Sequence, residues 1–243
     1  MEDPLTEDPP PSRFFDEDLN NFTPPSPLLP PPSLHFTTPT PLSPSLLIIA
    51  ISTPSIHVIN SLTQKSLLAT LTLPDTKKNS PSSVYTIPNN PNTVLITIQS
   101  STIPSEMSRA VAKFILDEIN PEKALILGSV QSRNYRGKLA PDEEMMFKLE
   151  TLEEKKSGGD LMVKGVDYFP SGSLIDGLGA AVLGQCQVRK IRGSLFVTWP
   201  DSSRGIVLKV KGLIEGLLGE LEFGDEGGVR IIRDSRDYYE LYA

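Results

Sequence analysis

The distribution of proline and glycine constrains the fold of this 243-residue chain more than any other feature. Thirteen of the 23 prolines lie before residue 45, whereas all 17 glycines lie at Gly128 or later. Proline fixes one backbone dihedral and donates no backbone hydrogen bond, so a segment this rich in proline disfavours helices and central strands. We therefore predict a disordered arm over residues 1–44, one α/β domain over residues 45–228 and a tail over residues 229–243.

Charge follows the same division. Residues 1–18 carry seven acidic side chains and one basic side chain, which together account for −6 of the formal net charge of −7. The rest of the chain is nearly neutral and has no basic run, so it offers little to the phosphates of a nucleic acid. We expect the acidic arm mainly to keep the chain soluble, with docking or phosphorylation as alternative roles.

The chain has few residues suited to redox or metal chemistry. Its single cysteine, Cys186, excludes a disulfide framework, and its two histidines, His35 and His57, are too few for a cysteine-histidine zinc site. The N-terminus resembles no secretory or transit signal, and the longest apolar run, Leu46–Ile51, is too short to span a bilayer. We expect no metal, no cofactor, no membrane segment, and a location in the cytoplasm, with the nucleus as a second compartment.

The first half of the domain contains strand-like segments. The apolar runs Leu46–Ile51 and Val94–Ile98 are rich in branched residues, which is typical of strands covered on both faces. Between them, Ile56–Asn60 and the alternating segment Leu67–Leu73 are predicted to form a hairpin or an edge pair. The proline-containing segment that follows, Pro74–Ser83, is predicted to be a loop.

The pattern changes to that of a helix at Ser105. Apolar residues recur at helical spacing from there until Asn120-Pro121, and Ala124–Leu127 follows as another strand. This strand, helix and strand predict a βαβ unit. Because such units give parallel strands covered by helices, we expect a three-layer sandwich with a mostly parallel central sheet.

The second half of the domain is rich in glycine. Gly172–Cys186 is predicted to be a loop leading into a helix of small residues, Leu195–Trp199 a strand, and Ile206–Leu218 an amphipathic helix that packs on the sheet. The charged run Glu153–Gly159 is interpreted as a solvated excursion. Gly224–Gly228 is predicted to be a flexible joint before the tail.

Candidate catalytic patterns are weak. Gly177-Leu178-Gly179 lacks the strand that feeds a dinucleotide-binding turn, so close packing of a helix on the sheet explains these glycines better. His57 lies among apolar residues without a nucleophile motif. Ser129, Arg133 and Asn134 follow the strand that ends at Leu127, where α/β folds bind ligands. A small-ligand pocket there, in an enzyme of the nucleoside-phosphorylase or hydrolase type, is the alternative hypothesis.

The last residues, Leu241-Tyr242-Ala243, form the best candidate for a functional site. They combine an apolar residue, a penultimate tyrosine and a terminal carboxylate. Such an ending suits insertion into a protein pocket, because the leucine and the ring are apolar while the hydroxyl and the carboxylate accept polar partners. The alternative is a frayed terminus in which Tyr242 has no role.

These features together resemble a known family. The segments Leu46–Ile51, Val94–Ile98 with the helix from Ser105, Ala124–Ser129, Gly177–Ala181 and the ending Leu241–Ala243 are similar to the proteasome assembly chaperones, in particular proteasome assembly chaperone 1. The proline-rich arm suggests a plant member. The resemblance covers roughly residues 45–243, and its ending is more distinctive than its body.

The resemblance implies a non-enzymatic function. Members of this family pair with a related second subunit, bind the outer face of the proteasome α-ring, promote its assembly and block premature binding of activators. Their hydrophobic-Tyr-X (HbYX) ending inserts between neighbouring α subunits of the 20S proteasome. By matching position, Leu241 is the apolar plug, Tyr242 the anchoring ring and Ala243 the carboxylate donor. A third hypothesis is a scaffold whose proline-rich arm is the functional part.

Overall fold

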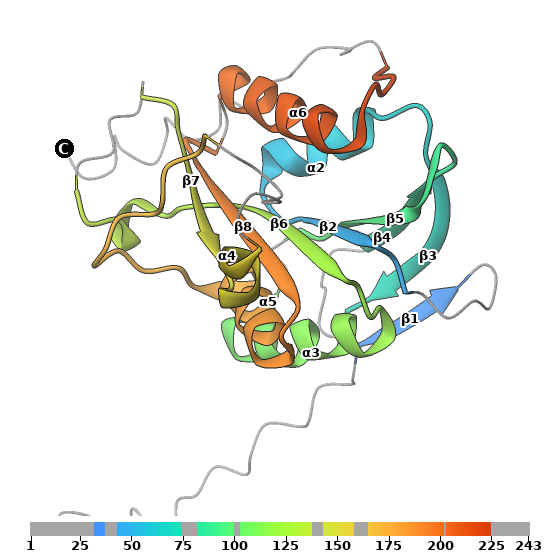
Figure 1. Ribbon diagram of the computed structural model, residues 1–243, viewed down its shortest axis with the longest axis horizontal. Helices are drawn as coiled ribbons and strands as arrows, with labels where there is room; N and C mark the ends of the chain where they lie inside the picture. Colours follow the sequence, from blue (N-terminus) through green and yellow to red (C-terminus); the bar gives the residue numbers. More distant parts are fainter. Residues whose placement is uncertain are drawn as a thin grey trace, which may run out of the picture. The chain divides into compact units, whose positions relative to one another are not determined.

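The computed structural model describes residues 32–36, 43–73, 82–99, 103–137, 143–157, 165–201 and 203–224. All of them lie within one structural unit, Pro31–Ala243. The described residues form an eight-stranded sheet of order β1-β3-β4-β5-β2-β6-β8-β7, with helices on both faces (Figure 1). The predicted arm up to residue 31 and the predicted tail lie outside the described residues, so both remain predictions.

The centre of the sheet is parallel. It consists of β5 (Asn90–Thr97), β2 (Leu46–Ala50), β6 (Lys123–Ser129) and β8 (Arg192–Trp199), which pair in register as parallel neighbours. Four successive residues of β2, from Leu47 to Ala50, are fully buried. A strand buried on both faces requires helices above and below it, and this explains its unbroken apolar sequence.

Both edges of the sheet are antiparallel. On one side, β4 (Ser82–Ile87) pairs with β5, β3 (Ser66–Thr72) pairs with β4, and β1 (Ser33–Phe36) pairs with β3. On the other side, β7 (Met145–Glu150) pairs with β8. The predicted α/β class is confirmed, with a parallel centre and antiparallel margins.

Two helices cover each face of the sheet (Figure 1). The pair α3 (Ser108–Glu118) and α5 (Gly177–Arg189) packs on the side chains of Leu47 and Ile49. The pair α2 (Thr53–Ser61) and α6 (Arg204–Leu218) packs on Ile48 and Ala50, which point the other way. Successive side chains of β2 therefore enter two separate hydrophobic cores. Three short helices complete the description: η2 (Ser105–Met107), η3 (Ser132–Asn134) and α4 (Leu152–Lys156).

The predicted βαβ unit is confirmed. Strand β5 leads through η2 and α3 into β6, and both strands run parallel to β2, which lies between them. The short helix η2 begins at Ser105, the predicted helix start. The crossover helix places its buried residues, including Val111 and Ile115, in the core shared with α5.

The prediction of a strand at Ile56–Asn60 is wrong. These residues belong to α2, which contains Pro54 in its first turn and buries Val58 and Ile59. Proline is well placed there, because the first turn of a helix needs no N–H from that residue. The branched side chains suggested a strand, whereas packing against α6 and the sheet favours the helix. The edge pair contains β3 and β4 instead.

The predicted disordered arm over residues 1–44 includes a strand that sequence reasoning missed. Residues Ser33–Phe36 form β1, antiparallel to β3, immediately after Pro32. A short edge strand tolerates a preceding proline. Such a strand pairs on one side only, so half of its backbone N–H groups need no partner in the sheet. High local proline content therefore concealed these four residues.

The interpretation of Glu153–Gly159 as a solvated excursion is wrong at Glu154, whereas Lys155 and Lys156 are exposed as expected. Helix α4 buries Glu154 completely, and Arg192 donates from Nε to its carboxylate at 2.8 Å. Thr151 caps this helix by accepting a hydrogen bond from the backbone N–H of Glu154. A buried carboxylate needs such a partner, and the partner lies 38 residues away in the sequence.

Candidate functional site

The predicted binding residues Leu241, Tyr242 and Ala243 lie outside the described residues, so their role remains a prediction. The structure does define where the preceding chain is held. After α6, Phe223 forms a bridge with Leu62, and the N–H of Gly224 donates to the carbonyl of Ser61 at 2.8 Å. The last described residues, Phe223 and Gly224, therefore lie beside the C-terminal end of α2.

The structure places a cavity where the sequence predicted a small-ligand pocket, at the carboxyl ends of the parallel strands. It has a volume of about 540 Å³. Ser129 and Arg133 line it together with Asp176, Trp199 and Asp201. The apolar part of its lining includes Ile51, Ile103, Leu178, Leu195 and Val197. Asn134 does not line the cavity but donates a hydrogen bond to Asp176 at 2.8 Å.

Both carboxylates of this pocket have partners within the chain. The carboxylate of Asp176 accepts from Asn134 and lies 3.7 Å from the guanidinium of Arg133. The hydroxyl of Thr53 donates to the carboxylate of Asp201 at 3.2 Å. Burial raises the pKa of the Asp201 carboxyl, while hydrogen bonds from Thr53 and Ser129 act in the opposite direction. The described groups therefore stabilise the walls of the pocket.

His57 does not join this pocket. It lies on α2, and its buried Nε2 atom makes no hydrogen bond to any described residue. The residues that line the cavity include no histidine. The serines that line the cavity therefore have no histidine beside them among the described residues.

The glycines of α5 have a packing role at one position and none at another. A Cβ atom on Gly179 would lie 3.4 Å from Leu195, which confirms that this residue lets the helix approach the sheet closely. An added Cβ on Gly177 would meet nothing within 4 Å, so the close-packing interpretation is wrong there. The glycine at 177 has a positive φ of 65°, which favours glycine where the loop turns into the helix.

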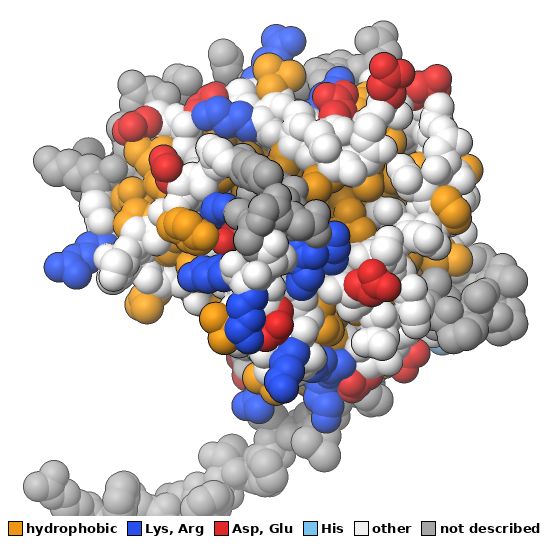
Figure 2. All heavy atoms as spheres, viewed as in Figure 1, with side chains coloured by type: hydrophobic (Ala, Val, Ile, Leu, Met, Phe, Trp, Pro, Cys, Tyr) orange, Lys and Arg blue, Asp and Glu red, His pale blue; other side chains and the backbone are white. Residues whose placement is uncertain are grey.

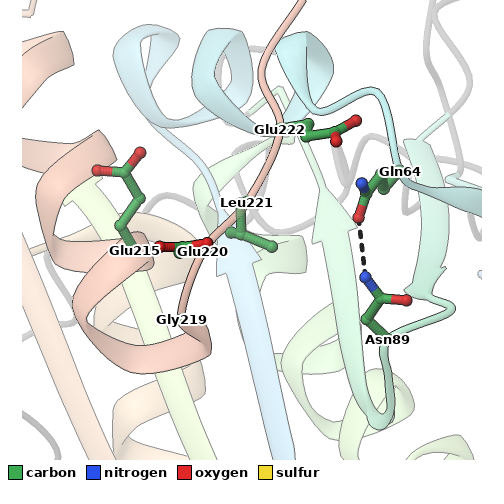
Figure 3. Close-up of a pocket in the computed structure, with 7 residues that line it drawn as sticks. All are labelled: Gln64, Asn89, Glu215, Gly219, Glu220, Leu221 and Glu222. Atoms are coloured by element: carbon green, nitrogen blue, oxygen red, sulfur yellow. Dashed lines mark hydrogen bonds between the residues drawn. The ribbon is translucent and has the colours of Figure 1, made fainter.

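A second, acidic hollow lies between the end of α6 and the β4–β5 turn (Figure 3). It has a volume of about 800 Å³, and Glu215, Glu220 and Glu222 line it with Gln64 and Asn89. Asn89 donates a hydrogen bond to Gln64 at 3.0 Å. Figure 3 shows that the three carboxylates point in different directions, so they do not converge on one ligand position.

The described ranges contain no candidate metal-binding group and no candidate membrane-spanning helix. Within them, no group of three histidine, cysteine or acidic residues is placed to hold a metal ion. None of the helices that the structure describes combines the length and the apolar sequence needed to cross a bilayer.

These observations define the class of the molecule as an α/β sandwich with a mixed eight-stranded sheet and a self-paired polar pocket at its carboxyl edge. No family model and no curated protein matches the sequence. Solved structures share the fold, however, and one of them, known in two crystal forms, is an archaeal homolog of proteasome-assembly chaperone.

Three of these structures show the extent of the likeness. Pyrococcus furiosus PbaB, an archaeal proteasome activator, has a TM-score of 0.59 and 14% identity over 87% of this chain and 97% of its own. Pyrococcus furiosus PbaA, an archaeal homolog of proteasome-assembly chaperone, has a TM-score of 0.57 and 14% identity over 87% and 94%. A Thermoplasma acidophilum protein of unknown function has a TM-score of 0.54 and 16% identity over 72% and 76%. At these identities the likeness establishes the fold.

Proposed function

We propose that this protein is a proteasome assembly chaperone, corresponding to the first subunit of the heterodimeric chaperone of the 20S α-ring and of plant type. The observation that carries the proposal is the fold shared with PbaA, which extends over 87% of this chain and 94% of that one. The sequence resemblance to the proteasome assembly chaperones lies in elements of this same fold, from β2 to α5, and in the ending Leu241–Ala243. Its partners are then proteasome α subunits and a related second chaperone subunit, in the cytoplasm and the nucleus.

The pocket chemistry supports a binding role rather than catalysis. Arg133 and Asp201, the polar groups most suited to a reaction, contact neighbouring side chains of the same chain. The cavity that they line contains no histidine to act as a base. The function therefore consists of contacts with other proteins, and the chain needs no cofactor for it.

The proposed mechanism uses the tail as a weak anchor. Leu241 fills an apolar slot between two α subunits, the Tyr242 ring packs beside it, and the carboxylate of Ala243 pairs with a lysine of the pocket. Three residues gain little free energy beyond the cost of ordering themselves, so the tail binds weakly alone. Linkage to a folded domain raises its effective concentration at the ring, where it also occupies the site that an activator needs.

A deletion tests this mechanism. A chain that ends at Glu240 is expected to bind purified α-ring particles at least about tenfold more weakly than the full chain, since the anchor and its carboxylate are lost. Surface plasmon resonance measures both affinities. The matched control is Tyr238→Ala, which removes a tyrosine of the same segment outside the motif and should leave the affinity unchanged. Equal binding by the truncated and full chains would contradict the tail mechanism.

The cavity at the carboxyl ends of the strands favours one alternative. Its position and its volume of about 540 Å³ suit a small ligand, as in α/β enzymes of the nucleoside-phosphorylase or hydrolase type. A ligand in this pocket would meet the exposed guanidinium of Arg133, which lies 3.7 Å from Asp176, and the carboxylate of Asp201, which accepts from Thr53. The ligand-binding experiment in the Discussion separates this alternative from the chaperone.

A further inference from the structure

An apolar groove lies along the β7 edge of the sheet, between β7 and α5. Its volume is about 300 Å³. Most of its lining is aliphatic, and its residues are Leu149, Glu150, Thr151, Ile175, Ala180, Leu183, Gly184, Gln187 and Leu195. Leu183 and Leu149 also contact the core beneath α5, so the groove is an open extension of that core.

Three exposed hydrophobic residues are direct sequence neighbours of residues that line this groove. Leu152 is 51% exposed, Leu174 is 68% exposed and Val188 is 77% exposed. They make up half of the six large hydrophobic side chains that are exposed in the described part of the chain. Each follows or precedes a lining residue directly in the sequence. An apolar groove on segments that also carry exposed apolar residues is typical of a surface that binds protein.

The walls of the groove are fixed before any partner binds. The backbone N–H of Leu152 donates to the side-chain carbonyl of Gln187 at 2.8 Å, which joins α4 to α5. The N–H of Gly193 donates to the hydroxyl of Thr151 at 2.9 Å, which joins the start of α4 to β8. A preformed surface loses little conformational entropy on binding, so its apolar area is available for affinity.

Basic residues lie at the C-terminal ends of α4 and α5, the two helices joined beside the groove. Lys155 and Lys156 lie in the last turn of α4, and Arg189 and Lys190 lie at the end of α5. Arg189 pairs with Asp117 and Lys156 pairs with Glu153, whereas Lys155 lies over the Tyr168 ring and Lys190 caps α5 with its backbone. Figure 2 shows Lys and Arg side chains gathered on the lower middle of the face that contains α4 and α5.

This charge selects against a second copy of the chain. In a two-fold symmetric dimer built on the groove, these basic residues of the two copies would face each other or lie close together, and like charges at an interface reduce affinity. A partner of different sequence, with apolar side chains for the groove and acidic side chains around them, meets both requirements.

We infer that the α5–β7 groove is the docking surface for a different protein chain with an acidic border, and not for a second copy of this one. The inference rests on the proposed function, under which this partner is the second chaperone subunit. It assigns the second subunit to the groove and the α-ring to the tail. Substitutions in the groove should therefore weaken the two-chain complex without changing how the tail binds the α-ring.

The test compares two exposed hydrophobic residues on opposite faces. The tagged full chain is purified from a native extract, its partner is identified by mass spectrometry, and the two chains are produced together. Val188→Asp places a charge beside the groove, whereas the control Leu208→Asp places one on α6, where Leu208 is 53% exposed. Affinities are measured by analytical ultracentrifugation, and circular dichroism checks that both variants unfold at the wild-type temperature.

The expected results and the results that would overturn the inference are distinct. The inference predicts that Val188→Asp weakens the two-chain complex by about tenfold or more, while Leu208→Asp leaves it unchanged and both variants keep the α-ring binding of the tail. The double variant Lys155→Glu with Lys190→Glu should also weaken it, most strongly at low salt. A complex that Val188→Asp does not affect overturns the inference. A homodimer of the chain alone that Val188→Asp disrupts overturns it as well.

Discussion

The pocket at the carboxyl ends of the strands and the α5–β7 groove use their side chains in opposite ways. At the pocket, Asp176 accepts a hydrogen bond from Asn134 and pairs with Arg133, and Asp201 accepts a hydrogen bond from Thr53. In the groove, aliphatic side chains line the surface, and exposed ones are their neighbours in the sequence. A ligand of the pocket meets polar groups that already have partners, whereas a protein in the groove gains by burying apolar area. The difference favours recognition of protein over chemistry on a small molecule.

The largest expected effect concerns the helix that borders the groove. Glu154→Ala removes a fully buried carboxylate and leaves Arg192 without its ion-pair partner on α4. We expect the free energy of unfolding to fall by about 2 kcal/mol, because the partly buried Arg192 then loses its counter-charge but keeps its hydrogen bond to Ser157. Urea denaturation followed by circular dichroism measures the change.

The neighbouring residue provides the control for that experiment. Glu153 is partly exposed and pairs with Lys156 on the same helix. Glu153→Ala should therefore lower stability by less than about 1 kcal/mol, as is usual for surface pairs. Similar losses for the two variants would mean that the Glu154–Arg192 pair does not hold α4 against β8.

A smaller effect is expected from pH at the pocket. Burial raises the pKa of Asp201 above its ordinary value of 3.8, so the folded protein holds this proton more tightly than the unfolded chain does. The contribution of Asp201 to stability is therefore greatest below the ordinary pKa and declines as the pH rises through the raised one.

Asp201→Asn removes the titration while keeping an acceptor for Thr53. The variant should lose the part of the pH dependence that arises between the ordinary and the raised pKa of Asp201, as measured by urea unfolding at several pH values from 3.8 upward. Identical pH profiles for variant and wild type would show that this carboxyl is solvated in both states.

The smallest expected effect is that of small ligands on the pocket. Nucleosides together with phosphate should leave the thermal unfolding temperature unchanged, because Arg133 and Asp201 already have partners. Differential scanning fluorimetry measures this temperature. A rise that Arg133→Ala abolishes would support an enzyme of the nucleoside-phosphorylase or hydrolase type. The pocket, and not the groove, would then be the main binding site of the chain.

The sequence predicted the elements whose signal is local. The unbroken apolar sequence of Leu47–Ala50 identified a strand buried on both faces, and the period from Ser105 identified the crossover helix. The helix at Ile56–Asn60 was missed because its branched residues favour strands locally, whereas packing between α6 and the sheet decides for a helix.

Features that depend on distant partners were not predictable from sequence. Glu154 appears in a charged run that is typical of solvated surface. Its burial is stable because Arg192 of β8 pairs with its carboxylate. The α5–β7 groove likewise requires α4, α5 and β8 to be placed in space. In the predicted pocket, the positions of Ser129 and Arg133 followed from the carboxyl end of one strand, but their internal pairing did not.

Purification of the tagged full chain from a native extract, followed by native mass spectrometry, tests the central proposal most directly. The masses and identities of the co-purifying chains show which assemblies contain the protein. An assembly chaperone should be recovered with proteasome α subunits and one further chaperone subunit of different sequence. Recovery of the protein as a monomer, or with chains that include no proteasome α subunit, would contradict the proposed function.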